Sequence, residues 1–119
     1  MRPIPRAYVT TPYGRVGTHW AAGKHTGRDY RARIPTSVYA TAGGRVVHVG
    51  RYGGWGDAYG IHVIVDTGGI RHLYAHLMRT TVREGQQVAA GTRVGISGNT
   101  GNSTAPHLHY EERRYPYTY

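Results

Sequence analysis

The sequence contains no cysteine and no phenylalanine, few acidic residues and no long hydrophobic segment. The absence of cysteine excludes disulfides and zinc sites built from cysteine thiolates. No apolar run approaches the roughly 18 residues that a membrane-spanning helix needs. The N-terminal segment MRPIPRAYVTTP has no apolar core either. We therefore expect neither a membrane span nor a signal peptide.

Acidic side chains number only 6 against 15 lysines and arginines, which gives a formal net charge of +9. Arginine supplies almost all of this charge, and its residues are dispersed rather than gathered in one basic run. A nucleic-acid-binding role therefore has only net charge in its support, and we expect no nucleic-acid partner. Anionic polymers of a bacterial wall fit the charge equally well, and we expect them as partners of the basic surface.

The residues that are present are typical of one small β domain. A chain of 119 residues suffices for a single core. We expect one domain over residues 1–119, with an irregular arm at 1–23 and a tail at 114–119. Glycine occurs 18 times, as expected of tight turns between short strands. No window shows sustained helical periodicity, so the sequence predicts a mostly β fold.

Short stretches between turn signals predict the strands, and Ile61–Asp66 is rich in β-branched residues. Ile61–Asp66 and Ile70–His76 are expected to pair as antiparallel neighbours across a Thr-Gly-Gly turn. Ser37–Tyr39 and Arg45–Val49 flank a Gly-Gly turn signal, which predicts a second hairpin. The remaining strands are expected at Arg93–Ser97 and His107–Arg113.

The segment TGNSTAPHLHYE, residues 100–111, carries two histidines two positions apart. On a strand, side chains at i and i+2 point to the same face, so His107 and His109 are expected side by side with Leu108 turned away. Glu111 shares the face of the two histidines. Two imidazoles in one space suggest a metal site, a proton-transfer site or both. The alternative is a pair of surface histidines on a solvated strand face.

Two further segments carry histidines. In HTGRD, the imidazole of His25 and the carboxylate of Asp29 are suitable zinc ligands, and a turn with a solvated histidine is the alternative. In HLYAH, the period of two places His72, Tyr74 and His76 on one strand face. His76 ends that strand, where grooves are most often lined. For His72 we favour a polar outer face of the sheet.

HTGRD, LYAHL and GNTGNSTAPHLHYE resemble, in order, the three signature segments of the M23 (lysostaphin/LytM-type) peptidoglycan endopeptidases. The connecting run VREGQQVAAGTRVGISGNTG agrees as well, so that the resemblance extends over residues 10–113. It implies a compact single domain of the duplicated-hybrid-motif type, built on an antiparallel β-sheet with an open groove. The short form without a signal peptide suggests a monomeric phage lysin or an isolated catalytic domain that acts at the bacterial cell wall.

The resemblance also implies a role for each residue. His25, Asp29 and His109 match the family's zinc ligands, with one Zn²⁺ per chain, whereas His76 and His107 match its catalytic histidines. Three ligands leave a fourth position for water, as catalytic zinc requires. The implied activity is hydrolysis of amide bonds in the cross-bridges or stem peptides of peptidoglycan, which would make the protein bacteriolytic.

Two other functions compete with this hypothesis. The first is a catalytically inactive M23-like module that binds walls or scaffolds a complex, although every expected ligand position is filled. The second is a small basic nucleic-acid-binding domain, whose aromatic platform would come from tyrosines such as Tyr8 and Tyr13. A loop tyrosine that many family members carry before the first ligand has only His19 or Tyr13 as a substitute here. Trp55 lies on a Gly-rich loop that is either a connector or a groove wall.

Overall fold

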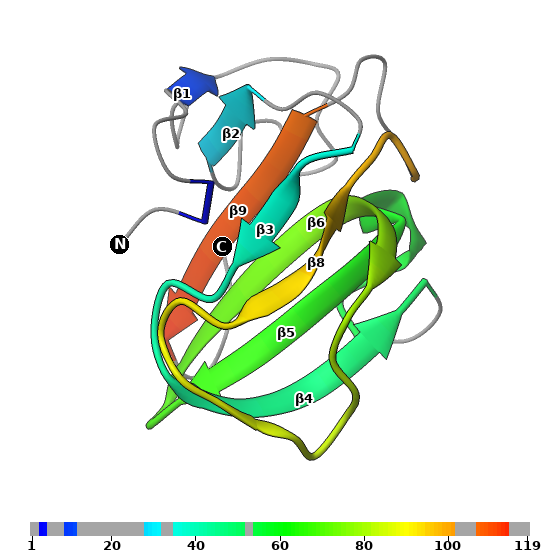
Figure 1. Cartoon of the computed structure of the whole chain (residues 1–119). Helices are drawn as coiled ribbons and strands as arrows, with labels where there is room; N and C mark the ends of the chain where they lie inside the picture. Colours follow the sequence, from blue (N-terminus) through cyan, green and yellow to red (C-terminus); the bar gives the residue numbers. More distant parts are fainter. Residues whose placement is uncertain are drawn as a thin grey trace.

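The computed structural model describes residues 3–4, 9–11, 28–31, 35–51, 54–101 and 107–114. Within these ranges the regular secondary structure is almost entirely strand, with one short 3-10 helix (Figure 1). The elements are β1 Val9–Thr11, β2 Arg28–Arg31, β3 Ser37–Tyr39, β4 Gly44–Gly50, η1 Asp57–Tyr59, β5 Ile61–Thr67, β6 Ile70–Thr80, β7 Gln87–Val88, β8 Arg93–Ser97 and β9 His107–Arg114. None of the helical structure in these ranges is long and apolar enough to cross a membrane.

The main sheet has the strand order β1-β2-β9-β6-β5-β4-β7, and its pairs are antiparallel. The long strand β6 changes partner along its length, because it pairs with β9 as far as Ala75 and with β8 from Leu77 onward. Strand β8 also pairs with β3. The β3–β8 pair therefore folds over one face of the main sheet, in front of β5 and β6 in Figure 1.

The two predicted hairpins have different outcomes. Pairing of β5 with β6 is confirmed. The predicted hairpin between Ser37–Tyr39 and Arg45–Val49 is wrong, since β3 pairs with β8 while β4 pairs with β5 and β7. The physical reason lies at Gly44, where an added Cβ would collide with the backbone carbonyl of Asp66. Glycine is thus needed there for the close approach of β4 to β5, not for a hairpin turn.

Side chains from the main sheet pack into two clusters, one on each face. The face covered by β3 and β8 is called the core face, and its buried cluster includes Val38, Val46, Val63, Val65, Tyr74, Leu77, Val94, Leu108 and Tyr110. The opposite face is called the outer face, and its smaller cluster consists of Ile64, Leu73 and Ala75 with the partly buried Val47, Trp55 and Tyr59. Alternation along the strands assigns neighbouring residues to opposite faces.

His76 interrupts this alternation. Its φ of 61° lies in the left-handed region, which is uncommon for residues other than glycine. Ile61 and Val63 are two positions apart on β5, but their partners Leu77 and Tyr74 on β6 are three positions apart. Strand β6 therefore holds one extra residue, which is a β-bulge. Bulges re-aim a side chain, and the chain turns here from β9 toward β8.

The predicted common face of His72, Tyr74 and His76 is wrong because of this bulge. Nδ1 of His72 lies 2.7 Å from the hydroxyl of Tyr110, and the Tyr74 and Tyr110 rings are 5.3 Å apart, so His72 and Tyr74 belong to the core face. His76 lies instead on the outer face, with its ring 4.8 Å from that of His107. The polar outer face predicted for His72 is wrong as well, since its side chain is buried.

Candidate metal and catalytic site

Strand pairing brings Asp29 and His109 together on the outer face, although 80 positions separate them in the chain. The two residues are direct partners across β2 and β9, and Ala75 of β6 is the partner of His109 on its other side. Partners in an antiparallel pair have adjacent side chains. As a result, Oδ1 of Asp29 lies 2.9 Å from Nδ1 of His109.

His107 joins the same group from β9. Its Nε2 lies 3.5 Å from Oδ1 of Asp29, while Leu108 is fully buried in the core-face cluster. The prediction that His107 and His109 lie side by side with Leu108 turned away is therefore confirmed. Both imidazoles approach the same carboxylate oxygen of Asp29.

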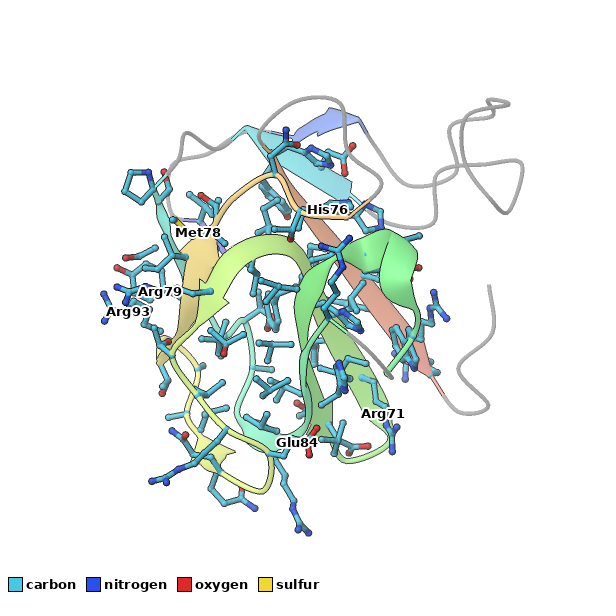
Figure 2. All side chains as sticks on the ribbon, turned by 90° about the vertical axis from the view of Figure 1, so that its right-hand side faces the viewer. Arg71, His76, Met78, Arg79, Glu84 and Arg93 are labelled. Carbon is cyan, nitrogen blue, oxygen red and sulfur yellow. The ribbon has the colours of Figure 1, made fainter. Side chains whose placement is uncertain are left out.

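The bulge places His76 against these two histidines, with ring centroids 4.8 Å from His107 and 6.1 Å from His109. Figure 2 shows His76 at the curved end of the sheet, whereas Arg71 and Glu84 lie toward the opposite end. Nδ1 of His76 lies 2.6 Å from the carbonyl oxygen of Thr100. A carbonyl only accepts hydrogen bonds, so Nδ1 carries the hydrogen and Nε2 has the lone pair of the neutral ring.

Electrostatics favour different charge states for two of these histidines. Burial lowers the pKa of His76 to about 4, and the nearby imidazoles of His107 and His109 act in the same direction. For His109, burial also disfavours the charged ring, but hydrogen bonds to Asp29 and Glu111 outweigh it and raise the pKa to about 9. His109 is therefore protonated between two carboxylates, and a metal ion at Nδ1 would displace that proton.

The donor atoms fit a zinc site in part. A carboxylate oxygen of Asp29 and an imidazole nitrogen of His109 converge, and both are common zinc ligands. Over the described ranges, no group of three such side chains forms a metal-binding arrangement. His25, the third predicted ligand, lies outside the described residues. So do His19 and Tyr13.

Two residues that contact Glu111, Tyr59 and Arg113, were not identified from the sequence. Glu111 is buried, and its carboxylate contacts Tyr59 and Arg113 as well as His109. Hydrogen bonds from His109 and Tyr59 and the charge of Arg113 outweigh the effect of burial, so that the pKa of Glu111 is lowered. Arg113 in turn lies over the ring of Trp55, 4.0 Å from its centroid. The period of two from His107 would have found Arg113, but nothing local indicates Tyr59.

The model of Peptidase family M23 matches residues 23–117 of the chain. The chain belongs to peptidase family M23. This M23 chain is 46% identical over 117 residues to the DD-carboxypeptidase/endopeptidase Mpg of Neisseria meningitidis serogroup B, with 95% of the chain and 26% of the relative covered. It thus spans about a quarter of the length of that relative.

Solved structures agree with the family. The catalytic domain of the antimicrobial peptidase lysostaphin from Staphylococcus simulans matches with a TM-score of 0.84 at 30% identity, covering 95% of the M23 chain and 83% of the lysostaphin domain. A zinc containing peptidase from Vibrio cholerae matches with a TM-score of 0.81 at 27% identity, covering 93% and 35%. The predicted mostly β, antiparallel fold is confirmed. The open groove and the individual roles of the site residues stay predictions.

Proposed function

We propose that the chain is a zinc-dependent endopeptidase that hydrolyses amide bonds in bacterial peptidoglycan. The observation that carries the proposal is the convergence of Asp29 Oδ1 with His109 Nδ1 at 2.9 Å, beside the rings of His76 and His107. The M23 family match and the likeness to a zinc containing peptidase support it. The bulge at His76 adds independent support, because strained backbone of this kind clusters at active sites.

Asp29 and His109 would hold the zinc ion together with His25, which matches the remaining ligand of the family. The three side chains supply one oxygen and two nitrogens, a ligand set that leaves a catalytic position open. When bound, zinc supplies Lewis acidity, which polarises a carbonyl oxygen and makes water more acidic. Asp29 also neutralises part of the positive charge that a metal brings to this face.

His76 and His107 would move the protons of the reaction. Amide hydrolysis needs one group to take a proton from water and another to protonate the leaving amine. His76 presents a lone pair at Nε2 that could take a proton, because its Nδ1 is held by the carbonyl of Thr100 and burial, which lowers the pKa, keeps the ring neutral. His107 lies beside it, with Nε2 directed toward Asp29. The two rings are close enough to serve the same scissile bond.

The substrate class follows from the family and from the charge. Peptidoglycan is the substrate that the M23 resemblance implies, and the Neisseria relative carries a name that specifies DD-carboxypeptidase and endopeptidase action. Its identity to this chain favours links between D-configured residues over glycyl-glycine bridges. The net charge of +9 would attract anionic wall polymers. If that attraction matters, lysis of wall fragments declines as salt is added, and insensitivity to salt would contradict it.

Metal analysis beside digestion of defined muropeptides tests the proposal. The wild-type protein should hold one zinc ion per chain and release cleavage products that mass spectrometry identifies. His109→Ala should lose the zinc, whereas His107→Ala should keep it and lose turnover. His72→Phe, on the core face, serves as the matched histidine control and should keep both. Full activity in the His109 or the His107 variant would overturn the assignment.

A further inference from the structure

Glu111 is a fully buried carboxylate on the outer face of β9. A buried charge is costly unless it is paired and hydrogen-bonded. Oε2 accepts hydrogen bonds from Nε2 of His109 at 2.8 Å and from the hydroxyl of Tyr59 at 2.6 Å. Oε1 faces Arg113, whose Nε lies 2.8 Å and whose Nη2 lies 2.6 Å away. Both oxygens are therefore held by donors.

Tyr59 and Arg113 also hold each other, which leaves the carboxylate little freedom to rotate. Nη2 of Arg113 donates to the Tyr59 hydroxyl at 2.8 Å, and its guanidinium covers the ring of Trp55. The ring of Tyr59 stacks on that of His109, with centroids 5.8 Å apart and an interplanar angle of 21°. Each group that touches Glu111 is thus fixed by a second contact.

The orientation of Glu111 determines which nitrogen of His109 is offered to a ligand. A carboxylate only accepts hydrogen bonds, so Nε2 of His109 must carry a hydrogen. Asp29 accepts from Nδ1 at 2.9 Å in the same way, so the metal-free ring carries both hydrogens. Because Glu111 retains the hydrogen on Nε2, a metal beside Asp29 would displace the hydrogen on Nδ1. Without Glu111, the ring could keep its hydrogen on Nδ1 instead, and it could turn.

We propose that Glu111 is a positioning residue, whose buried carboxylate fixes the tautomer and the orientation of His109 so that Nδ1 is presented to a metal beside Asp29. The proposal rests on the proposed function, because it takes His109 as a zinc ligand. Carboxylates that accept from the second nitrogen of a ligating histidine also raise its basicity. Tyr59 and Arg113 act one step further out, by holding the carboxylate in place.

The next residue along β9 supplies a matched control. Glu112 has the same charge, but its Oε1 accepts a hydrogen bond from the Tyr110 hydroxyl at 2.7 Å on the core face. Its side chain is 59% exposed. Glu112→Gln therefore removes an adjacent carboxylate of the same strand without touching the hydrogen bond to His109.

The test compares Glu111→Gln with Glu112→Gln in two measurements. One is the zinc dissociation constant, from competition with a chromophoric chelator, and the other is the tautomer of His109, from long-range ¹H–¹⁵N NMR of the ring nitrogens. The glutamine side chain has one oxygen and one NH₂ group in place of two accepting oxygens. Its NH₂ group must therefore face either the Arg113 donors or those of His109 and Tyr59, and one of these hydrogen-bond sets is lost. We expect Glu111→Gln to weaken zinc binding by about 10- to 100-fold and to depopulate the Nε2–H form, while Glu112→Gln stays within about 2-fold of wild type.

Tyr59→Phe provides a gentler variant, because it keeps the ring on His109 and deletes only the hydroxyl. Loss of one hydrogen bond to Oε2 should weaken zinc binding by about 2- to 10-fold. A merely structural role would lower the melting temperature and leave the affinity and the ring-nitrogen shifts of the folded protein unchanged. If Glu111→Gln shows only a lower melting temperature, the proposal is overturned. If Glu111→Gln does not fold, the same result in Tyr59→Phe overturns it.

Failure of the proposed function gives a different result. If wild-type protein and His109→Ala bind zinc equally weakly, the zinc assignment is wrong. The NMR measurement still decides the role of Glu111 when metal-free protein is titrated to a pH above the His109 pKa of about 9, where the ring is neutral. An unchanged His109 tautomer in Glu111→Gln then overturns that role, and a shift to Nδ1–H supports it.

Discussion

Strands β6 and β9 carry two histidine environments back to back, one on each face of the same sheet. On the core face, His72 lies against Tyr110, whose hydroxyl also meets that of Thr41 at 2.8 Å. On the outer face, His109 lies between Asp29 and Glu111. The hydrogen-bond partners of His72 are hydroxyl groups, and those of His109 are carboxylates.

This difference shows what converts a buried histidine into a candidate ligand. A hydroxyl both donates and accepts, so the Tyr110 hydroxyl can pair with Nδ1 of His72 in either tautomer and does not fix which nitrogen carries the hydrogen. Carboxylates only accept, so they orient the imidazole and leave a defined nitrogen for a metal. Burial alone does not distinguish the two environments, because His72 and His109 are each 6% exposed.

The largest expected contrast between the faces is in catalysis. His76→Ala should reduce kcat/KM for muropeptide digestion by about 10²- to 10⁴-fold, which corresponds to about 3–5 kcal/mol of transition-state stabilisation. Its zinc content should stay at the wild-type level, since His76 is not among the proposed ligands. His72→Phe should digest at close to the wild-type rate. Equal losses in the two variants would remove the distinction between the faces.

Tyr110→Phe, on the core face, should reduce stability without reducing zinc binding. The Tyr110 hydroxyl contacts His72, Thr41 and Glu112, so its deletion leaves buried polar atoms without that partner. We expect the free energy of unfolding in urea to fall by about 1–3 kcal/mol, with zinc affinity unchanged. Tyr39→Phe, at a half-buried tyrosine of β3 outside this cluster, is the control. A loss of zinc affinity in Tyr110→Phe would show that the faces are coupled.

Acid stability should report on His72 in particular. Nε2 of His72 is buried and has no hydrogen-bond partner among the described residues, and burial lowers the pKa of the ring below 6.5. The unfolded chain therefore takes up the proton first, so this contribution is complete above pH 6.5 and is lost as the pH falls below it. In chelator-treated protein between pH 8 and pH 5, His72→Phe should reduce the slope of unfolding free energy by up to about 1.4 kcal/mol per pH unit. Parallel curves would contradict this.

The smallest expected effect concerns the bulge that separates the faces. Ala at position 76 must adopt the positive φ of His76, whereas Gly does so without strain. His76→Gly should therefore be more stable than His76→Ala by about 1 kcal/mol in the same urea titration. At the adjacent Ala75, which has an ordinary strand backbone, substitution by Gly should instead be destabilising. If Gly were less stable than Ala at position 76 as well as at position 75, the result would argue against the bulge.

Local features of the sequence predicted the strands but not all of their partners. The β-branched run of β5 and the Thr-Gly-Gly turn after it predict β5, β6 and their pairing, and all three are confirmed. β3 and β4 carry an equally good turn signal, yet each pairs elsewhere. A turn signal is local, whereas the partner of β3 lies more than 50 residues along the chain and is chosen by packing.

The candidate site shows the same division. Alternation alone was sufficient to place His107 and His109 on one face. It failed at His76, because neither glycine nor proline marks the bulge in the sequence. The proximity of Asp29 to His109 is a matter of register between distant strands, so only the family resemblance indicated it. Tyr59 reaches Glu111 from η1 and could not be found from any spacing.

The pairing of Asp29 with His109 has a consequence for folding. Bringing these partners together closes a loop of 80 positions. The conformational entropy of such a long loop is lost before the contacts between its ends can stabilise the chain. We therefore expect β5 and β6, which are joined by a tight turn, to associate before β2 docks on β9. An ion bound by residues of both strands would stabilise the pairing of β2 with β9. Metal binding and the docking of β2 would then be thermodynamically coupled.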